Sequence, residues 1–218
     1  MIKKALSAPP SWNSGRVVGP KTEFTELQVA KLERILERNQ NWHDLVLLTV
    51  GVDSMLRASD LLQLRVKDVA YPSGKIRSEL RTRQQKTNYE VYPVLNIDAR
   101  AWLRIWIAKS GKSQDHFLFT RKKEADADPI TRGHYARLTK RWADWLELPS
   151  EEYSTHSLRR SKPVIMFEAG KPIELISELL GHQSVATTTR YLGINQKKAR
   201  AAALDHRIFK GPSKDYLQ

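Results

Sequence analysis

The chain has 218 residues, contains no cysteine, and carries 37 Lys and Arg against 24 Asp and Glu, a formal net charge of +13. The lack of cysteine excludes disulfides and thiolate metal sites. The positive charge indicates a polyanionic partner, most simply nucleic acid, and the alternative is an ordinary basic protein.

No stretch approaches the roughly 18 apolar residues of a membrane span, and no apolar run follows the lysines of the first ten residues, as a signal peptide would require. We therefore expect a cytoplasmic, nucleoid-associated protein without a membrane partner. The length fits one domain.

The first third of the chain predicts mainly helices. Residues 1–20 mix proline and glycine with polar residues and predict a flexible arm. Apolar residues recur at helical spacing over 25–39, and an apolar segment over 42–52 predicts a second helix. A helix is predicted from about Ala58, passing into a strand at 66–69.

A small sheet and a helix are predicted next. Alternating residues at 75–83 and 88–94 predict two antiparallel strands joined through 84–88, with Pro93 marking an edge or a strand end. A helix follows from Asp98 to Gly111, and 117–119 forms a short apolar element.

The rest of the chain predicts helices separated by Gly and Pro. They cover 131–145, 156–170, 172–181, 187–192 and 197–204. The pattern as a whole predicts an α+β fold, mainly helical, with a small antiparallel β-sheet.

Residues 155–192 place His156, Arg159, His182 and Tyr191 close together in sequence. A phenol has a pKa near 10, so its attack on a phosphodiester needs a proton acceptor, and the phosphate needs fixed cations. A His-x-x-Arg spacing alone is weak, because His134 begins another one. Only the pair at 156 and 159 precedes Leu-Gly-His and then a tyrosine.

Five segments together resemble the tyrosine recombinase family, the phage-integrase type of site-specific DNA recombinase. They are LRASDLLQLRVKDV, QQKTN, THSLRR, ELLGHQS and TTTRYL, in the family's order. The resemblance covers about residues 20 to 205. It implies a catalytic tyrosine-recombinase domain at 21–194, and a helix and tail at 195–218 that is exchanged between protomers.

The resemblance also implies a role for each matching residue. Tyr191 matches the nucleophile that forms a 3′-phosphotyrosyl link. The other matches are two phosphate-clamping arginines, Arg57 and Arg159; a phosphate contact, His182; a proton acceptor, His156; a lysine that protonates the leaving oxygen, Lys86; and a supporting acid, Asp60. No metal or other cofactor is implied.

Simpler interpretations stay open for three of these residues. Tyr191 could anchor a short helix, and Arg57 could form a surface pair with Asp60. Lys86 could be an ordinary turn lysine, with Lys75 as the alternative. Basic residues that could contact phosphates elsewhere are Arg81, Arg83, Lys197 and Lys198.

Two departures from the family pattern stand out. Only about 20 residues precede the catalytic segment, where many members carry a DNA-clamping domain, so the chain resembles a short, single-domain bacterial branch. Arg160-Ser161-Lys162 replaces a more common His-Thr-Ala-like run, and we expect it to affect packing or backbone contacts.

The resemblance implies an integrase, resolvase or invertase that cuts and rejoins double-stranded DNA, acting as a homo-tetramer with an accessory DNA-bending protein. Two alternatives are a type IB topoisomerase-like enzyme and a non-catalytic DNA-binding regulator. A recombinase or regulator should prefer one DNA site, whereas a topoisomerase should not.

Overall fold

The computed structural model describes residues 21–121, 127–194 and 196–205. The expected arm at 1–20 lies outside these residues. Within them the chain is mainly helical, with one two-stranded antiparallel sheet, which confirms the predicted fold class. No described helix is long and apolar enough to cross a bilayer.

Helices α1 (Glu26–Arg38), α2 (Trp42–Asp53) and α5 (Ile97–Ser110) pack against one another. The Thr25 side chain accepts a hydrogen bond from the Gln28 amide and so caps α1. Helix α2 is apolar on most sides because it lies in the interior. These helices, with α6 (Arg132–Trp145), contribute to the large hydrophobic cluster, whose fully buried residues include Leu36, Leu47, Leu103 and Trp142.

The strand predicted at 66–69 is wrong. Residues Ala58–Leu61 form α3, and Val66–Val69 form a second short helix, α4. Two buried valines three positions apart fit one face of a helical turn rather than the alternation of a strand. The Asp68 carboxylate accepts a hydrogen bond from the Arg65 amide at 2.7 Å and caps that turn.

The predicted hairpin is present but shorter than expected. Its strands are β1 (Thr82–Arg83) and β2 (Glu90–Val91), with Thr82 opposite Val91. Ile76 forms an isolated bridge with Ala70 instead of the partner strand. Pro93 lacks an N–H and cannot complete the ladder, so pairing beyond β2 is irregular.

The C-terminal half consists of helices joined by short turns. After α6 come a short 3₁₀-helix η1 (Ser150–Glu152), α7 (Thr155–Glu168), α8 (Ile173–Leu180), α9 (Val185–Tyr191) and α10 (Gln196–Asp205). These agree with the predicted helices to within about two residues.

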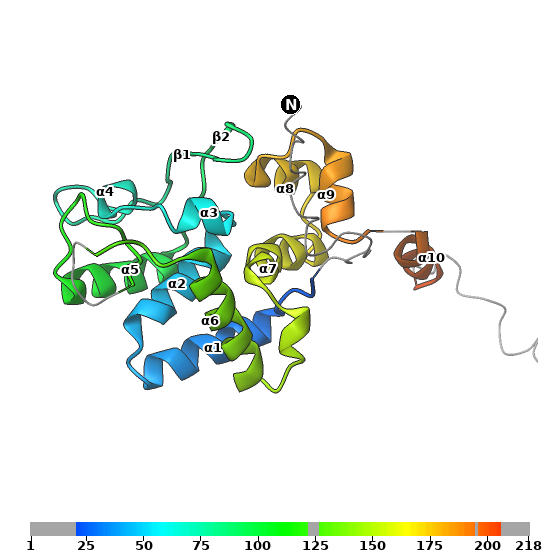
Figure 1. Cartoon of the computed structure of the whole chain (residues 1–218). Coiled ribbons are helices and arrows are strands. Elements are labelled where there is room, and N and C mark those ends of the chain that lie inside the picture. The colour runs from blue at the N-terminus through cyan, green and yellow to red at the C-terminus, as the bar shows by residue number, and fades with distance from the viewer. Residues whose placement is uncertain (1–20, 122–126, 195, 206–218) are drawn as a thin grey trace, which may run out of the picture.

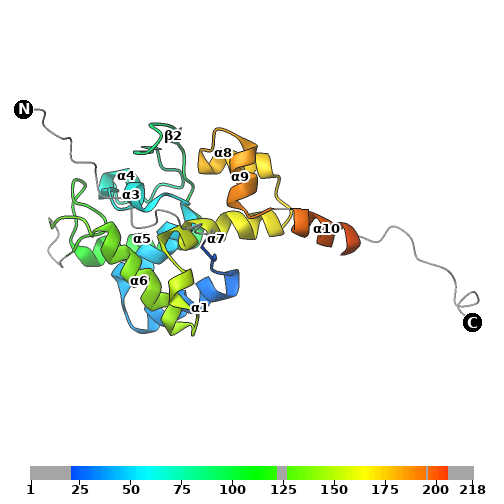
Figure 2. The same ribbon diagram turned by 45° about the vertical axis from the view of Figure 1, so that its right-hand side comes forward.

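Helix α7 joins two parts of the molecule (Figure 1). On one side lies the large cluster with the hairpin above it. On the other, α8 and α9 pack on a small hydrophobic cluster that consists of Met55, Val164, Ile176, Leu180 and Leu192. Helix α10 stands away from both in the two ribbon views (Figure 2).

Candidate active site

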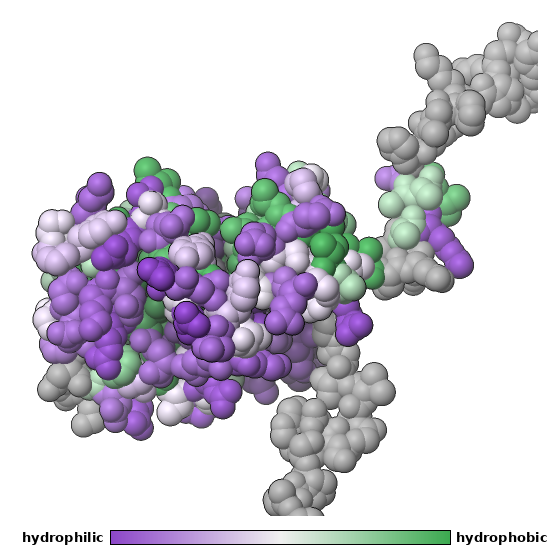
Figure 3. Space-filling model, turned by 90° about the horizontal axis from the view of Figure 1, so that it is seen from above, coloured by the Kyte–Doolittle hydropathy of each residue, from purple (hydrophilic) through white to green (hydrophobic). Residues whose placement is uncertain are grey.

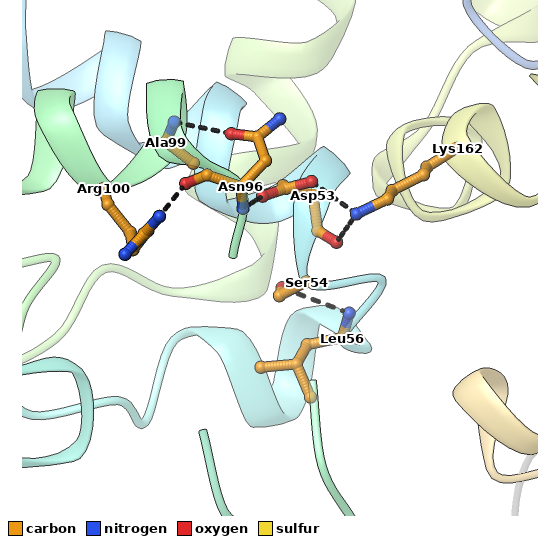
Figure 4. Close-up of polar contacts among 7 residues, drawn as sticks. All are labelled: Asp53, Ser54, Leu56, Asn96, Ala99, Arg100 and Lys162. Carbon is orange, nitrogen blue, oxygen red and sulfur yellow. Dashed lines mark hydrogen bonds and ion pairs between the residues drawn. The ribbon is translucent and has the colours of Figure 1, made fainter. Parts of the chain in front are cut away.

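Arg57 is the N-cap residue of α3 and follows the end of α2, where Asp53 is anchored from two sides. The Asp53 carboxylate accepts a hydrogen bond from the Asn96 amide at 2.5 Å (Figure 4). It also forms an ion pair with Lys162 of α7, whose Nζ donates to the Asp53 carbonyl at 2.9 Å. Both connections fix the backbone that leads into Arg57.

The buried amide of Gln84 lies between the two expected phosphate-binding arginines. Its Oε1 accepts hydrogen bonds from Arg57 Nη1 and from the Thr87 hydroxyl, and its Nε2 donates to the Leu180 carbonyl at 3.1 Å. The same carbonyl accepts a hydrogen bond from Arg159 Nη2 at 3.2 Å. One side chain therefore connects the hairpin, α8 and both arginines.

Sequence reasoning did not find this role of Gln84. The QQKTN segment is of interest in the sequence for its lysine, and no sequence feature distinguishes its two glutamines. Gln84 is 1% exposed, whereas Gln85 is exposed to solvent. The difference arises from tertiary packing of the hairpin against α8.

Gly181 permits this close approach of the hairpin to α8. The residue ends α8 with φ +63°, a conformation that favours glycine. A Cβ there would lie 2.5 Å from Val91 Cγ1 and 3.0 Å from Gln84 Nε2. The glycine of the Leu-Gly-His segment is thus required both by its backbone and by its neighbours, and it places His182 directly after the contact.

Tyr191 ends α9 beside both expected histidines. The ring centroid lies 5.3 Å from that of His182 and 6.4 Å from that of His156. The His182 Nδ1 atom lies 2.9 Å from the Thr188 hydroxyl, which orients that ring. The Tyr191 hydroxyl and Arg159 Nη1 are both buried and make no hydrogen bond of good geometry in the described part of the chain, although the Arg159 guanidinium lies close enough to the phenol to favour its ionised form.

The electrostatics of the site keep the phenol and both imidazoles neutral near pH 7. Burial raises the pKa of Tyr191, and Arg159, Arg160 and Arg57 partly oppose this rise. Burial, with Arg159 and Arg57, lowers the pKa of His182 to about 4. Partial burial lowers the pKa of His156 as well, and the surrounding cations lower it further. A neutral imidazole can accept a proton, so the acceptor role expected for His156 is chemically available.

Lys86 lines an open groove of about 400 Å³ together with Arg57, His156 and Arg132. Lys75 does not line this groove and lies in a different one beside α5. The structure therefore brings Lys86, rather than its alternative, to the other site residues. Arg132, at the start of α6, was missed because the motifs contain no pattern that brings α6 toward the hairpin.

Asp60 and Arg57 do not form an ion pair. The Asp60 Oδ1 atom accepts hydrogen bonds from the Gln85 amide at 3.1 Å and from the Ser59 hydroxyl at 3.2 Å, whereas Arg57 binds Gln84. The alternative interpretation of Arg57 as the partner of Asp60 in a surface ion pair is therefore wrong. The buried Asp60 carboxylate supports the loop that carries Lys86.

The basic residues expected to contact DNA elsewhere lie apart from this groove. Arg81 forms an ion pair with Glu90 at 2.7 Å, and Arg83 donates to the Asn88 carbonyl at 3.2 Å. Both are exposed on the hairpin. The side chains of Lys197 and Lys198 lie outside the described residues.

The Arg160-Ser161-Lys162 run makes the backbone contacts expected of it. Arg160 Nη1 donates to the Lys21 carbonyl at 2.7 Å, the Ser161 hydroxyl accepts from the Phe24 amide, and Lys162 reaches Asp53. Among the described residues, no cluster of three His, Cys, Asp or Glu side chains is placed to hold a metal ion.

The face that carries the hairpin and α8 is mostly hydrophilic when seen from above (Figure 3). Six of the expected residues come together from four separate segments of the chain, namely Arg57, Lys86, His156, Arg159, His182 and Tyr191. A tyrosine, two histidines and several cations in one place define a site suited to phosphoryl transfer.

Comparison with known proteins assigns the family. Residues 23–198 match the phage integrase family model, so the chain belongs to this family of tyrosine recombinases. It is 29% identical over 188 residues to the probable integrase/recombinase YoeC of Bacillus subtilis, covering 84% of this chain and 96% of YoeC. It is 27% identical over 187 residues to the tyrosine recombinase XerA of Pyrococcus horikoshii, covering 84% of this chain and 61% of XerA.

Solved structures show the same fold. The crystal structure of XerA recombinase matches with a TM-score of 0.68 at 18% identity, over 93% of this chain and 68% of that one. The pre-cleavage complex of the XerH site-specific recombinase with its difH substrate matches with a TM-score of 0.65 at 18% identity, over 85% and 55% of the two chains.

Proposed function

We propose that the chain is a site-specific DNA recombinase that cuts and rejoins DNA through a 3′-phosphotyrosyl intermediate. The observation that carries the proposal is the burial of the Tyr191 hydroxyl close to the Arg159 guanidinium, where neither the hydroxyl nor Arg159 Nη1 makes a hydrogen bond of good geometry within the described residues. Buried polar groups are normally hydrogen-bonded. A backbone phosphate would supply a partner for the guanidinium and an electrophile for the phenol.

In the proposed cleavage step, Tyr191 Oη attacks the phosphorus and its proton passes to His156. The bond from phosphorus to the 5′-oxygen breaks, and Lys86 gives that oxygen a proton. Arg57, Arg159 and His182 stabilise the charge on the non-bridging oxygens. The strand is rejoined when a 5′-hydroxyl attacks the phosphotyrosyl bond, so no external energy source is needed.

Several features support DNA as the partner. The chain carries a net charge of +13, and XerH, whose fold it shares, was solved as a complex with its difH substrate. We propose synapsis of two DNA sites by four protomers, with an accessory DNA-bending protein as a further partner.

Covalent trapping tests this function. Supercoiled plasmid carrying the flanking genomic DNA is incubated with the protein, quenched with SDS, and examined for protein on a 3′ end. We expect an adduct that Tyr191→Phe abolishes and that the exposed hairpin variant Tyr92→Phe retains. An adduct with relaxation but no exchange between paired sites would indicate a topoisomerase-like enzyme. Site-specific binding without any adduct would indicate a regulator.

We also propose that residues 195–218 are exchanged between protomers on DNA. The separation of α10 from the other helices (Figure 2) and the 83% exposure of Leu204 support this proposal. Deleting 195–218 should abolish assembly on DNA while leaving thermal unfolding nearly unchanged. An unchanged oligomer on DNA after this deletion would contradict the exchange.

A further inference from the structure

Arg160 makes contacts on both sides of α7. It is 5% exposed, and its Nη2 atom forms an ion pair with the Glu23 carboxylate at 3.1 Å, in addition to the Lys21 carbonyl contact described above. On the other side its Cζ atom lies 5.6 Å from the ring centroid of Tyr191. This separation is within the range of a cation–π interaction.

The segment Lys21–Phe24 is itself fixed against the body of the protein. Phe24 is fully buried, and its ring centroid lies 4.5 Å from that of Tyr153. Its amide donates to the Ser161 hydroxyl at 3.0 Å, and the Thr22 amide donates to the Glu152 carbonyl at 3.2 Å. The segment therefore holds Glu23 in a defined place beside Arg160.

Arg160 differs from the other arginines near Tyr191 in the charge of its hydrogen-bond partners. Arg57 binds the neutral amide of Gln84, and Arg159 binds the Leu180 carbonyl. Within the described residues, Arg160 alone of the three has a carboxylate partner. The ionisable groups around the Tyr191 ring are Arg57, His156, Arg159, Arg160 and His182.

We propose that Arg160 is a positioning residue that links the Lys21–Phe24 segment to Tyr191, with Glu23 limiting the positive charge that reaches the phenol. The effect of this link on catalysis rests on the proposed function of Tyr191. The link itself exists without DNA and can be measured without it.

The two partners of the ion pair should affect Tyr191 in opposite directions. A nearby cation favours the phenolate, so Arg160→Gln should raise the pKa of Tyr191 by about one pH unit. Glu23→Gln removes the acid that offsets Arg160 and should lower that pKa by about half a unit. A purely structural role predicts that both variants loosen the same contact and move Tyr191 in the same direction.

The measurement is ¹⁹F NMR titration of protein in which 3-fluorotyrosine replaces tyrosine. Fluorine acidifies the phenol and brings its titration to a pH at which the fold is retained. The Tyr191 resonance is assigned by its loss in Tyr191→Phe. Tyr92, whose pKa is raised by its hydrogen bond to Glu90, is the internal control and should titrate alike in every variant.

Arg160→Lys completes the series because it keeps the charge and loses the planar group. Its Tyr191 titration should remain within about 0.3 pH units of the wild type. If Arg160→Gln does not fold, Glu23→Gln and Arg160→Lys still decide the question. Equal shifts in both neutral variants, or no shift in either, would overturn the proposal. Opposite shifts without any DNA adduct would uphold the link and reject the recombinase function.

Discussion

Arg57 and Lys86 belong to elements that rest on the large hydrophobic cluster, through Leu56, Leu61, Leu80 and Val91. His182 follows α8 and Tyr191 ends α9, and these two helices rest on the small cluster. Arg57 and Lys86 are therefore held by the most extensive packing in the molecule, and the proposed nucleophile by much less. Regions with fewer buried contacts open more readily, so we expect the nucleophile to be the mobile partner.

The junction between these two regions gives a large expected effect on stability. Gly181→Ala combines left-handed strain with overlap against Val91, and we expect unfolding free energy to fall by about 3 kcal/mol. Gly111→Ala is a matched control, because that residue also ends a helix at φ +63° but has nothing within 4 Å of a new Cβ. Urea unfolding of both variants measures the difference. Equal losses would show that the hairpin contact contributes nothing.

A pair of leucines tests the difference in packing directly. Leu103→Ala in the large cluster and Leu180→Ala in the small one each remove a buried leucine from a helix, at a cost of about 2–5 kcal/mol. Leu103→Ala should lower the midpoint of global unfolding. Leu180→Ala should chiefly accelerate amide hydrogen exchange in α8 and α9. If both variants affected all amides alike, the two regions would form one cooperative unit.

Gln84 connects the two regions through polar contacts. Gln84→Ala frees the Arg57 guanidinium and removes a partner of the Leu180 carbonyl, and a misplaced catalytic group should slow covalent adduct formation about thirtyfold. Gln85→Ala, at the exposed neighbouring position, should change the rate less than twofold. Single-turnover trapping measures both rates. Similar rates for the two variants would show that Gln84 does not position the site residues.

Acid should weaken the region that carries the nucleophile. The pKa of His182 is about 4 in the folded protein and 6.5 when unperturbed, so the unfolded chain binds the proton first as pH falls. Stability is therefore complete above pH 6.5 and decreases toward pH 4, by on the order of 1 kcal/mol because the ring is partly exposed. His182→Gln should flatten this part of the curve of stability against pH. An unchanged slope in that variant would assign the effect to other groups.

The sequence predicts well what depends on neighbouring residues. Thr25 and Thr131 cap the helices expected after them, because the hydroxyl of each binds a backbone amide three positions on. It predicts poorly what depends on distant packing. Its pattern predicts a strand at Val66–Val69, although Asp68 caps a helical turn there, and it predicts a longer hairpin than the structure has.

The site shows the same division. The motifs identify six residues that the structure brings together, although these residues lie far apart along the sequence. Nothing in the sequence distinguishes buried Gln84 from exposed Gln85, or places Arg132 beside Lys86. The ion pair between Arg160 and Glu23 likewise depends on how the chain enters α1, which no local pattern specifies.

The position of Tyr191 on the last helix of the compact body has a consequence for protein synthesis. The 134 positions that separate Arg57 from Tyr191 take roughly 7 to 27 s to translate. Under the proposed function, a nascent chain would in that interval carry proposed phosphate-binding arginines but not the proposed nucleophile. The order of these residues along the chain would then keep an incomplete polypeptide on the ribosome from cleaving DNA.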